Sequence, residues 1–176
     1  MNPQLLYFKD DGKTPNSDLP VVLYRRFLSE AAEPAGAFEA LFACHQWHPK
    51  WRAGIFDFHH YHSTAHEALG VASGSARVRL GGEAGQSLEL AAGDVLVLPA
   101  GTGHRCEQAS DDFLVVGAYP AGHDAYDLQR PGTANRAASK ERIARVPKPR
   151  ADPATGTTGA LMQAWQGLAF QTLDQR

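Results

Sequence analysis

The chain has 176 residues, 43% of them apolar, and a formal net charge of −2. This length favours one domain with a substantial core, and so small a charge gives no reason to expect nucleic acid or anionic membrane as a partner. No apolar run approaches the ~18 residues of a membrane span, and no leader segment is visible at the N-terminus. The two cysteines, Cys44 and Cys106, lack metal-site spacing, so we expect a cytoplasmic protein with reduced thiols.

The first 53 residues predict one strand and one helix. An apolar run at 19–24 suggests a strand, which Pro20 places at a sheet edge or at a strand start. A helix is expected from Pro34 to about His45, because proline suits the first helical position and apolar residues then recur on one helical face. The segment 47–51 carries two tryptophans, which either cover the mouth of a barrel or pack in its core. We favour the core.

Residues 54–119 consist of short β-rich runs separated by glycine- and aspartate-rich turns. Turns spaced by about 8–12 residues are typical of an antiparallel sandwich or barrel. We therefore predict an all-β protein with one domain in three parts. Residues 1–53 form a strand and a helix packed on the barrel, residues 54–119 form the barrel, and residues 120–176 form an irregular arm.

Four side chains within the barrel region have the spacing of a metal site. His60 and His62 are two residues apart and so leave the same face of a strand. Glu67 follows after enough residues for a tight turn and a return on the next strand. His104 comes after a Pro-Ala-Gly-Thr-Gly turn that ends an apolar run. Three imidazoles and one carboxylate suit a divalent first-row metal (iron, manganese, nickel, copper, cobalt or zinc), and leave open positions for water or substrate.

Two stretches of this region resemble the two signature motifs of the cupin superfamily. The first runs from Gly54 to Gly74 and the second from Gly93 to Gln108, where the motif usually ends in asparagine. The resemblance implies a double-stranded β-helix, also called a jelly-roll barrel, and it implies the metal ligands His60, His62, Glu67 and His104. The chain is also similar to a group of small bacterial single-domain cupins that share the run 59–67, for which no firm activity is implied.

Strand alternation predicts which other residues face the barrel interior. If His60 and His62 point inward, two phenylalanines do too, and an inward His104 brings two further side chains with it. The pocket candidates are therefore Phe56, Phe58, Cys106 and Gln108. Cys106 either lies beside the metal or is a small buried residue of the core, and the second role is the commoner one.

His66 is the rival of Glu67 for the fourth ligand position. The two residues are adjacent, so in a regular strand His66 faces the opposite side and lies behind the ligands or at the surface. A slip in the turn after His62 would exchange their roles. We favour Glu67 as the ligand.

After residue 119 the composition changes to proline, glycine, alanine and threonine. Between residues 130 and 150 there are seven lysines or arginines and one acid, Glu141. These form either a solvated arm or an anion-binding segment, and without interleaved aromatic residues we favour the arm. A short closing helix is expected over 159–167, with Leu161, Met162 and Trp165 packed on the body.

Two functions of different classes fit this sequence. The first is a metal-dependent small-molecule enzyme of the dioxygenase, isomerase or decarboxylase type, in which the ion acts as a Lewis acid or redox centre. The second is a non-catalytic metabolite-binding or sensing module with the same pocket. We favour the enzyme. A homodimer is also expected, because the N-terminal strand and the arm have little barrel to cover by themselves.

Overall fold

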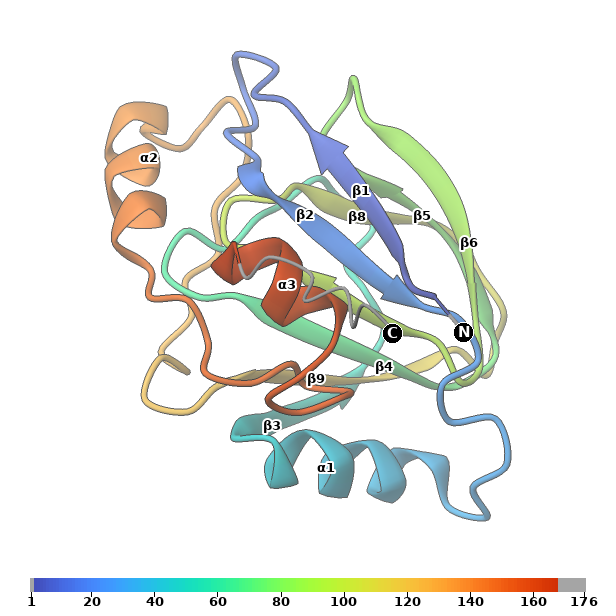
Figure 1. The fold of residues 1–176 in the computed structure, drawn as a ribbon. Coiled ribbons are helices and arrows are strands. Elements are labelled where there is room, and N and C mark those ends of the chain that lie inside the picture. Colours follow the sequence, from blue (N-terminus) through green and yellow to red (C-terminus); the bar gives the residue numbers. More distant parts are fainter. Residues whose placement is uncertain (1, 168–176) are drawn as a thin grey trace, which may run out of the picture.

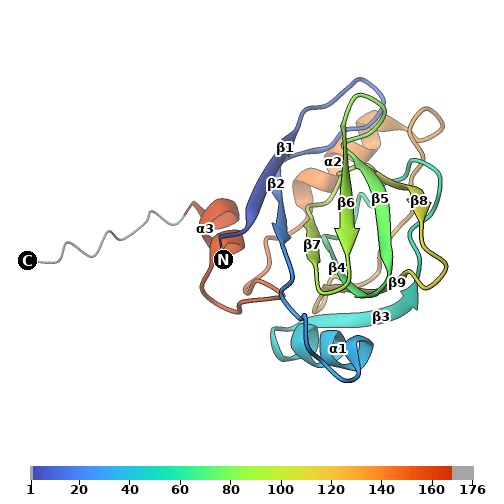
Figure 2. The ribbon, with the colours of Figure 1, turned by 90° about the vertical axis from the view of Figure 1, so that its right-hand side faces the viewer.

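The computed structural model describes residues 2–167, whose strands form two antiparallel sheets (Figures 1 and 2). The larger sheet has the order β1-β2-β7-β4-β9-β3 and the smaller has the order β6-β5-β8. This is the jelly-roll arrangement that the sequence predicts. The strands are β1 (Gln4–Phe8), β2 (Ser17–Tyr24), β3 (Trp47–Ala53), β4 (Glu67–Ser73), β5 (Ser75–Leu80), β6 (Gln86–Ala91), β7 (Val95–Leu98), β8 (His104–Ala109) and β9 (Leu114–Pro120).

The central strands of the larger sheet are buried on both faces, which explains their continuous apolar runs. In β7, Leu96 and Leu98 belong to the core that also holds the small sheet's apolar residues, whereas Val95 and Val97 belong to a second core on the outer face. In β2, Val21 and Leu23 likewise belong to the core between the sheets, and Val22 and Tyr24 belong to the outer core. A half-exposed strand would instead alternate apolar and polar residues.

Two helices cover the outer face of the larger sheet. Helix α1 (Pro34–Cys44) begins at the expected proline and buries Phe38 and Phe42. Helix α3 (Ala160–Gln166) buries Leu161, Met162 and Trp165, as the sequence predicts. Figure 1 shows α3 across the sheet and α1 below it. The outer core therefore needs elements from both ends of the chain.

The region before residue 54 contributes three strands to the larger sheet, where we expected one. Strand β3 begins right after α1 and pairs with β9, although Pro49 lies within it; a register shift falls between Pro49 and Trp51, which is where a proline is tolerated in a strand. Trp47 is 1% exposed, which confirms its role in the core.

The arm is less irregular than expected, because residues 136–145 form helix α2 (Arg136–Arg145). The Asn135 side chain accepts a hydrogen bond from the Ala138 amide at 3.1 Å and caps the helix. Its basic residues hold it to the body: Lys140 lies 3.0 Å from Asp10, which Arg136 also contacts, and Arg142 donates to Ser63 Oγ at 2.7 Å. These three basic residues therefore make specific polar contacts that hold α2 to the rest of the protein.

Within residues 2–167, no helix has the length and apolar character needed to cross a membrane. The homodimer stays a prediction, because the structure describes a single chain.

Gly70 in β4 is required by the helix that covers it. A Cβ atom at this position would lie 2.5 Å from Cδ1 of Phe38. We expect Gly70→Ala to destabilise the protein by about 1–3 kcal/mol through overpacking, although alanine in a strand is otherwise better than glycine by about 0.5–1 kcal/mol. Denaturant unfolding measures the change.

Gly54→Ala is the matched control, because a Cβ atom there meets nothing within 4 Å. Adding Phe38→Leu to Gly70→Ala should give a double variant less destabilised than the sum of the single variants. Additive effects would show that the two residues are not in conflict.

Candidate metal centre

His60 and His62 lie on an irregular segment between β3 and β4 that is fastened to β8. His60 and His104 exchange backbone hydrogen bonds, with N–O distances of 3.2 and 2.9 Å. The carbonyl of His62 accepts from the Gly101 amide at 2.8 Å. These contacts bring the rings of His60 and His104 to a centroid separation of 4.1 Å. The two sequence motifs therefore meet directly through their backbones.

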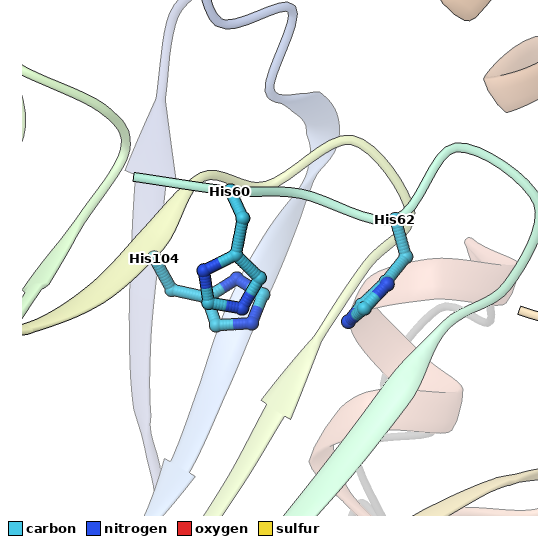
Figure 3. A group of neighbouring side chains, drawn as sticks. All are labelled: His60, His62 and His104. Atoms are coloured by element: carbon cyan, nitrogen blue, oxygen red, sulfur yellow. The ribbon is translucent and has the colours of Figure 1, made fainter. Parts of the chain in front are cut away.

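The three imidazoles are buried and converge (Figure 3). One nitrogen from each ring lies within 4.8 Å of the corresponding nitrogens of the other two. Nδ1 of each ring lies beside a backbone carbonyl oxygen: that of Phe58 at 2.9 Å for His60, that of Thr102 at 3.0 Å for His104, and that of Asp127 for His62. A carbonyl only accepts, so we assign the proton to Nδ1. In a neutral ring Nε2 then keeps a free lone pair, which is the arrangement of metal-binding histidines.

Glu67, the first residue of β4, lies beside two histidines of this cluster, His62 and His104. Its Oε1 accepts a hydrogen bond from the Tyr119 hydroxyl at 2.7 Å. Its Oε2 lies 3.4 Å from Nε2 of His62 and 3.2 Å from Nε2 of His104, yet this buried atom has no hydrogen bond of good geometry to any described residue. Lone pairs that face one another in a buried site require a cation or a proton between them. This donor set therefore fits a divalent metal ion.

The pKa values of the cluster indicate which group holds the balancing proton when no metal is bound. Burial raises the pKa of Glu67, but His62 and His104 outweigh it and hold that pKa well below its usual value. Burial lowers the pKa of His62, but Glu67 outweighs it and raises that pKa to about 9. Burial and the neighbouring His104 lower the pKa of His60 to about 3. A proton on His62 thus balances Glu67, and that proton must leave when a metal binds.

A chain of hydrogen bonds holds Glu67 in place. Trp51 Nε1 donates to the Tyr119 hydroxyl at 2.9 Å, and that hydroxyl donates to Glu67. Gly117 makes room for the indole, since a Cβ atom there would lie 2.1 Å from Trp51 Cε2. Burial and the Glu67 carboxylate raise the pKa of Tyr119, so its phenol stays protonated and is a fixed donor.

Residues 125–129 form a strap over the cluster, and the sequence analysis missed their role. The backbones of Tyr61 and Gln129 exchange hydrogen bonds of 3.0 and 2.9 Å. The Asp127 carboxylate accepts from the amides of Ser63 and Thr64, at 2.6 and 3.2 Å, while its carbonyl orients His62. No periodicity marks this segment, and only Asp127, a short polar residue that often binds backbone amides, offered a signal.

A cavity of about 290 Å³ opens above the four side chains. Tyr119 and Tyr126 line it, with their rings stacked at 4.2 Å. The rest of its wall is mostly apolar, from Trp51, Ala53, Ile55, Phe56, Leu69 and Leu128. Trp51 therefore lies where we considered a barrel-mouth role for the aromatic segment.

Of the four predicted pocket residues, the structure confirms Phe56 and corrects Phe58, Cys106 and Gln108. Phe56 lines the cavity but is 53% exposed at its mouth, because residues 54–58 are not a regular strand. Phe58 stacks on Phe56 at 4.8 Å and does not line the cavity. Cys106 packs in the inter-sheet core. Gln108 is exposed because β8 shifts register after Cys106: Cys106 pairs with Val78 but Gln108 with Arg77, so the extra residue turns Gln108 outward.

His66 lies outside the cluster and is buried on the other side of the strand. Its Nδ1 accepts from the Ala100 amide at 2.9 Å and its Nε2 lies 3.1 Å from the carbonyl of Pro147. It also packs against Trp165, with centroids 4.8 Å apart. The structure thus places Glu67 beside the histidines. His66 instead connects the barrel to the C-terminal segment through its contacts with Pro147 and Trp165.

Comparison with known proteins agrees with the fold. Residues 45–116 match the family model described as the cupin domain. The uncharacterized protein YjlB of Bacillus subtilis (strain 168) is 36% identical over 163 residues, which cover 92% of this chain and 96% of YjlB. The chain belongs to the cupin superfamily.

Solved structures resemble this cupin more distantly. A DUF861 family protein from Thermotoga maritima has 17% identity and a TM-score of 0.34, with 62% of this chain and 99% of that chain covered. An oxalate decarboxylase variant from Bacillus subtilis has 17% identity and a TM-score of 0.37, with 92% of this chain and 36% of that chain covered. TM-scores this low support no inference about activity.

Burial lowers the pKa of His66 to about 4, which predicts a pH dependence of stability. The folded pKa lies below the value of about 6.5 in an unfolded chain, so the unfolded state takes up the proton first. Stability should fall from pH 6.5 to pH 4, by about 3 kcal/mol from this residue. Unfolding of the metal-free protein across this range measures the slope.

His66→Gln should flatten that slope, because glutamine does not titrate. His48→Gln, at an exposed histidine, is the matched control and should keep the wild-type slope. Equal slopes for wild type and His66→Gln would contradict the assignment.

Proposed function

We propose that this cupin is a metal-dependent enzyme that acts on a small organic molecule. The observation that carries the proposal is the convergence of three buried imidazoles at the floor of a mostly apolar cavity, with Glu67 Oε2 lying 3.4 Å from Nε2 of His62 and 3.2 Å from Nε2 of His104. A structural metal site would instead be closed by protein ligands, commonly with cysteine among them. Here the four donors face an open space.

The donor set of nitrogen and oxygen suits iron, manganese, nickel, copper, cobalt or zinc. When bound, such an ion supplies Lewis acidity or a redox couple. His60, His62, His104 and Glu67 would hold it, and an ion that prefers six ligands would keep two positions for substrate or water. The backbone carbonyls on the three Nδ1 atoms fix the rings and increase their basicity.

Other residues of the cavity orient Glu67 and exclude water. Tyr119 remains a neutral donor that orients Glu67, and Trp51 keeps Tyr119 in place. The apolar walls exclude water, which strengthens electrostatic interactions at the cavity floor. These residues bind and orient; they do not themselves transfer protons.

A non-catalytic metabolite-binding cupin is the second candidate, and one observation favours it. Among the described residues that line the cavity, the ionisable side chains are the four donors and two tyrosines, Tyr119 and Tyr126. No separate general base is found among these lining residues. An enzyme here would rely on the metal or on a ligand released from it, whereas a binding module would need no base at all.

Replacement of a donor histidine tests the metal site. We expect His60→Ala and His104→Ala to lower metal affinity by more than about 100-fold, since even residues behind the ligands commonly contribute 10- to 100-fold. Both variants should stay folded, because the two apolar cores do not include these histidines, and His62 and the Tyr119 hydroxyl still face the Glu67 carboxylate. Metal content per chain and thermal unfolding are the measurements.

His59→Ala is the control, because the adjacent His59 lies against Glu83 at 2.7 Å and is not part of the cluster. Full metal content in His60→Ala, or equal loss in His59→Ala, would refute the assignment.

Open coordination positions distinguish a working site from a structural one. The iron(II) form should bind nitric oxide and the cobalt(II) form should bind azide, each with a changed absorption spectrum. We expect these changes at millimolar probe concentration or below. If neither probe alters the spectrum, the metal has no exchangeable position and the catalytic proposal fails.

A further inference from the structure

The cavity contains few charges, and their sum restricts what it can bind. Glu67 contributes one negative charge, and three neutral imidazoles contribute none. With the divalent ion proposed above, the site carries one net positive charge. No lysine or arginine is among the described residues that line the cavity. Arg130 lies over Phe58, which stacks on Phe56 at the mouth, but neither Arg130 nor Phe58 lines the cavity. Among the described lining residues, the metal site is therefore what balances the charge of an incoming molecule.

Burial makes this balance important. The cavity walls are mostly hydrocarbon and aromatic surface, where an uncompensated charge is costly. A chelator with one negative charge makes the site neutral. A chelator with two negative charges leaves one unbalanced charge against apolar walls. A cavity built for a dianion would be expected to carry a cationic side chain, as carboxylate sites usually do.

Size limits the molecule as well. A cavity of about 290 Å³ is roughly twice the ~150 Å³ that accommodates benzene in an engineered protein cavity. One substituted ring, or an aliphatic group of similar size, fits in this space. A nucleotide or an oligosaccharide does not.

The cavity mouth is built from exposed apolar side chains. Phe56 is 53% exposed, Tyr126 is 42% exposed and Leu128 is 45% exposed, and they are three of the six large hydrophobic residues that are exposed in residues 2–167. All three line this one cavity. Apolar residues gathered at a cavity mouth mark a ligand site more often than chance exposure.

Tyr126 gives the mouth a flat surface. Its ring stacks on Tyr119 at 4.2 Å with an interplanar angle of 10°, and the neighbouring Asp127 is anchored to Ser63 and Thr64. The ring is therefore held in a defined orientation although it is partly exposed. A fixed aromatic face favours a planar partner.

We propose that this site binds a small chelating molecule that carries a single negative charge and a flat, largely apolar body, and that it discriminates against dianions. The inference rests on the proposed metal site and names the class of ligand for it. The metal site selects the charge, and Phe56, Tyr126 and Leu128 select the shape.

Three oxygen chelators separate charge from shape. Tropolone is a monoanion with a flat ring, glycolate is a monoanion without a ring, and oxalate is a dianion without a ring. Each is titrated into the cobalt(II)-loaded protein and followed by the visible absorption of the metal. Each affinity is divided by the affinity of the same chelator for aqueous cobalt(II) in the same buffer, which removes its intrinsic preference for the metal.

On this relative scale we expect oxalate to bind at least about tenfold more weakly than glycolate, and tropolone at least about tenfold more tightly than glycolate. Tyr126 also packs against the ring of His62, with centroids 5.4 Å apart, so we expect Tyr126→Ala to weaken tropolone by about 2- to 10-fold more than it weakens glycolate. Tyr7→Ala is the control, because Tyr7 is also an exposed tyrosine, 66% exposed, but lies on β1 and does not line the cavity.

Two kinds of failure are distinguishable. If the metal loads and the probes bind, but oxalate equals or exceeds glycolate, or Tyr126→Ala affects all probes equally, the ligand class is wrong and the metal site stands. If no metal loads, or no probe changes the spectrum, the proposed function fails and this inference fails with it.

Discussion

The carboxylate of Glu67 is 2% exposed in the interior of a β-barrel, and much of the surrounding structure serves to balance that charge. A buried carboxylate without partners would be strongly destabilising. Imidazoles from two chain segments face one oxygen, and the Tyr119 hydroxyl donates to the other. The same charge that must be balanced for folding is the one that attracts a cation. The metal affinity that we propose would thus have the same origin as part of the stability of the protein.

The balance requires the larger sheet to have its observed strand order. Glu67 lies on β4, Tyr119 on β9 and Trp51 on β3, and these three strands are neighbours in the sheet. The donor chain from Trp51 through Tyr119 to Glu67 therefore crosses the sheet from its edge strand to the metal cluster. Gly117 allows this crossing because only a residue without a side chain leaves room for the indole. Gly117 thus allows both the packing of Trp51 and its hydrogen bond to Tyr119.

The strap over residues 125–129 connects the cavity mouth to the cluster. The carbonyl of Asp127 orients His62, while its neighbours Tyr126 and Leu128 line the cavity. Helix α2 supports the same region, since Arg142 donates to Ser63, which also contacts Asp127. A movement of the strap would change the mouth and the orientation of one donor together. Selectivity and donor geometry are therefore coupled through one short segment.

Local patterns were sufficient for most strands between residues 67 and 120 and for two of the helices, but they missed β1 and β3. Apolar runs such as 95–98 predicted strands, Pro34 predicted the start of α1, and apolar spacing predicted the buried face of α3. The spacing of the two motifs and the turns beside them also predicted that His60, His62, Glu67 and His104 lie close together, although His60 and His62 lie on an irregular segment and not on a regular strand. Glu67 begins β4 and faces two of the histidines, whereas His66 precedes the strand and contacts Ala100 and Pro147 instead.

Alternation failed where the backbone departed from a regular strand. The register shift in β8 turned Gln108 outward, and the irregular segment 54–58 left Phe56 at the mouth and Phe58 outside the cavity. Tyr119, Gly117 and the 125–129 strap came from segments whose local sequence says nothing of a metal. The sequence by itself thus determined most of the barrel strands and the proximity of His60, His62, Glu67 and His104, since period and spacing are properties of neighbouring residues. Only the tertiary structure decided the partners of Glu67, the orientation of His62 and the cavity wall, because these depend on contacts between segments far apart in the chain.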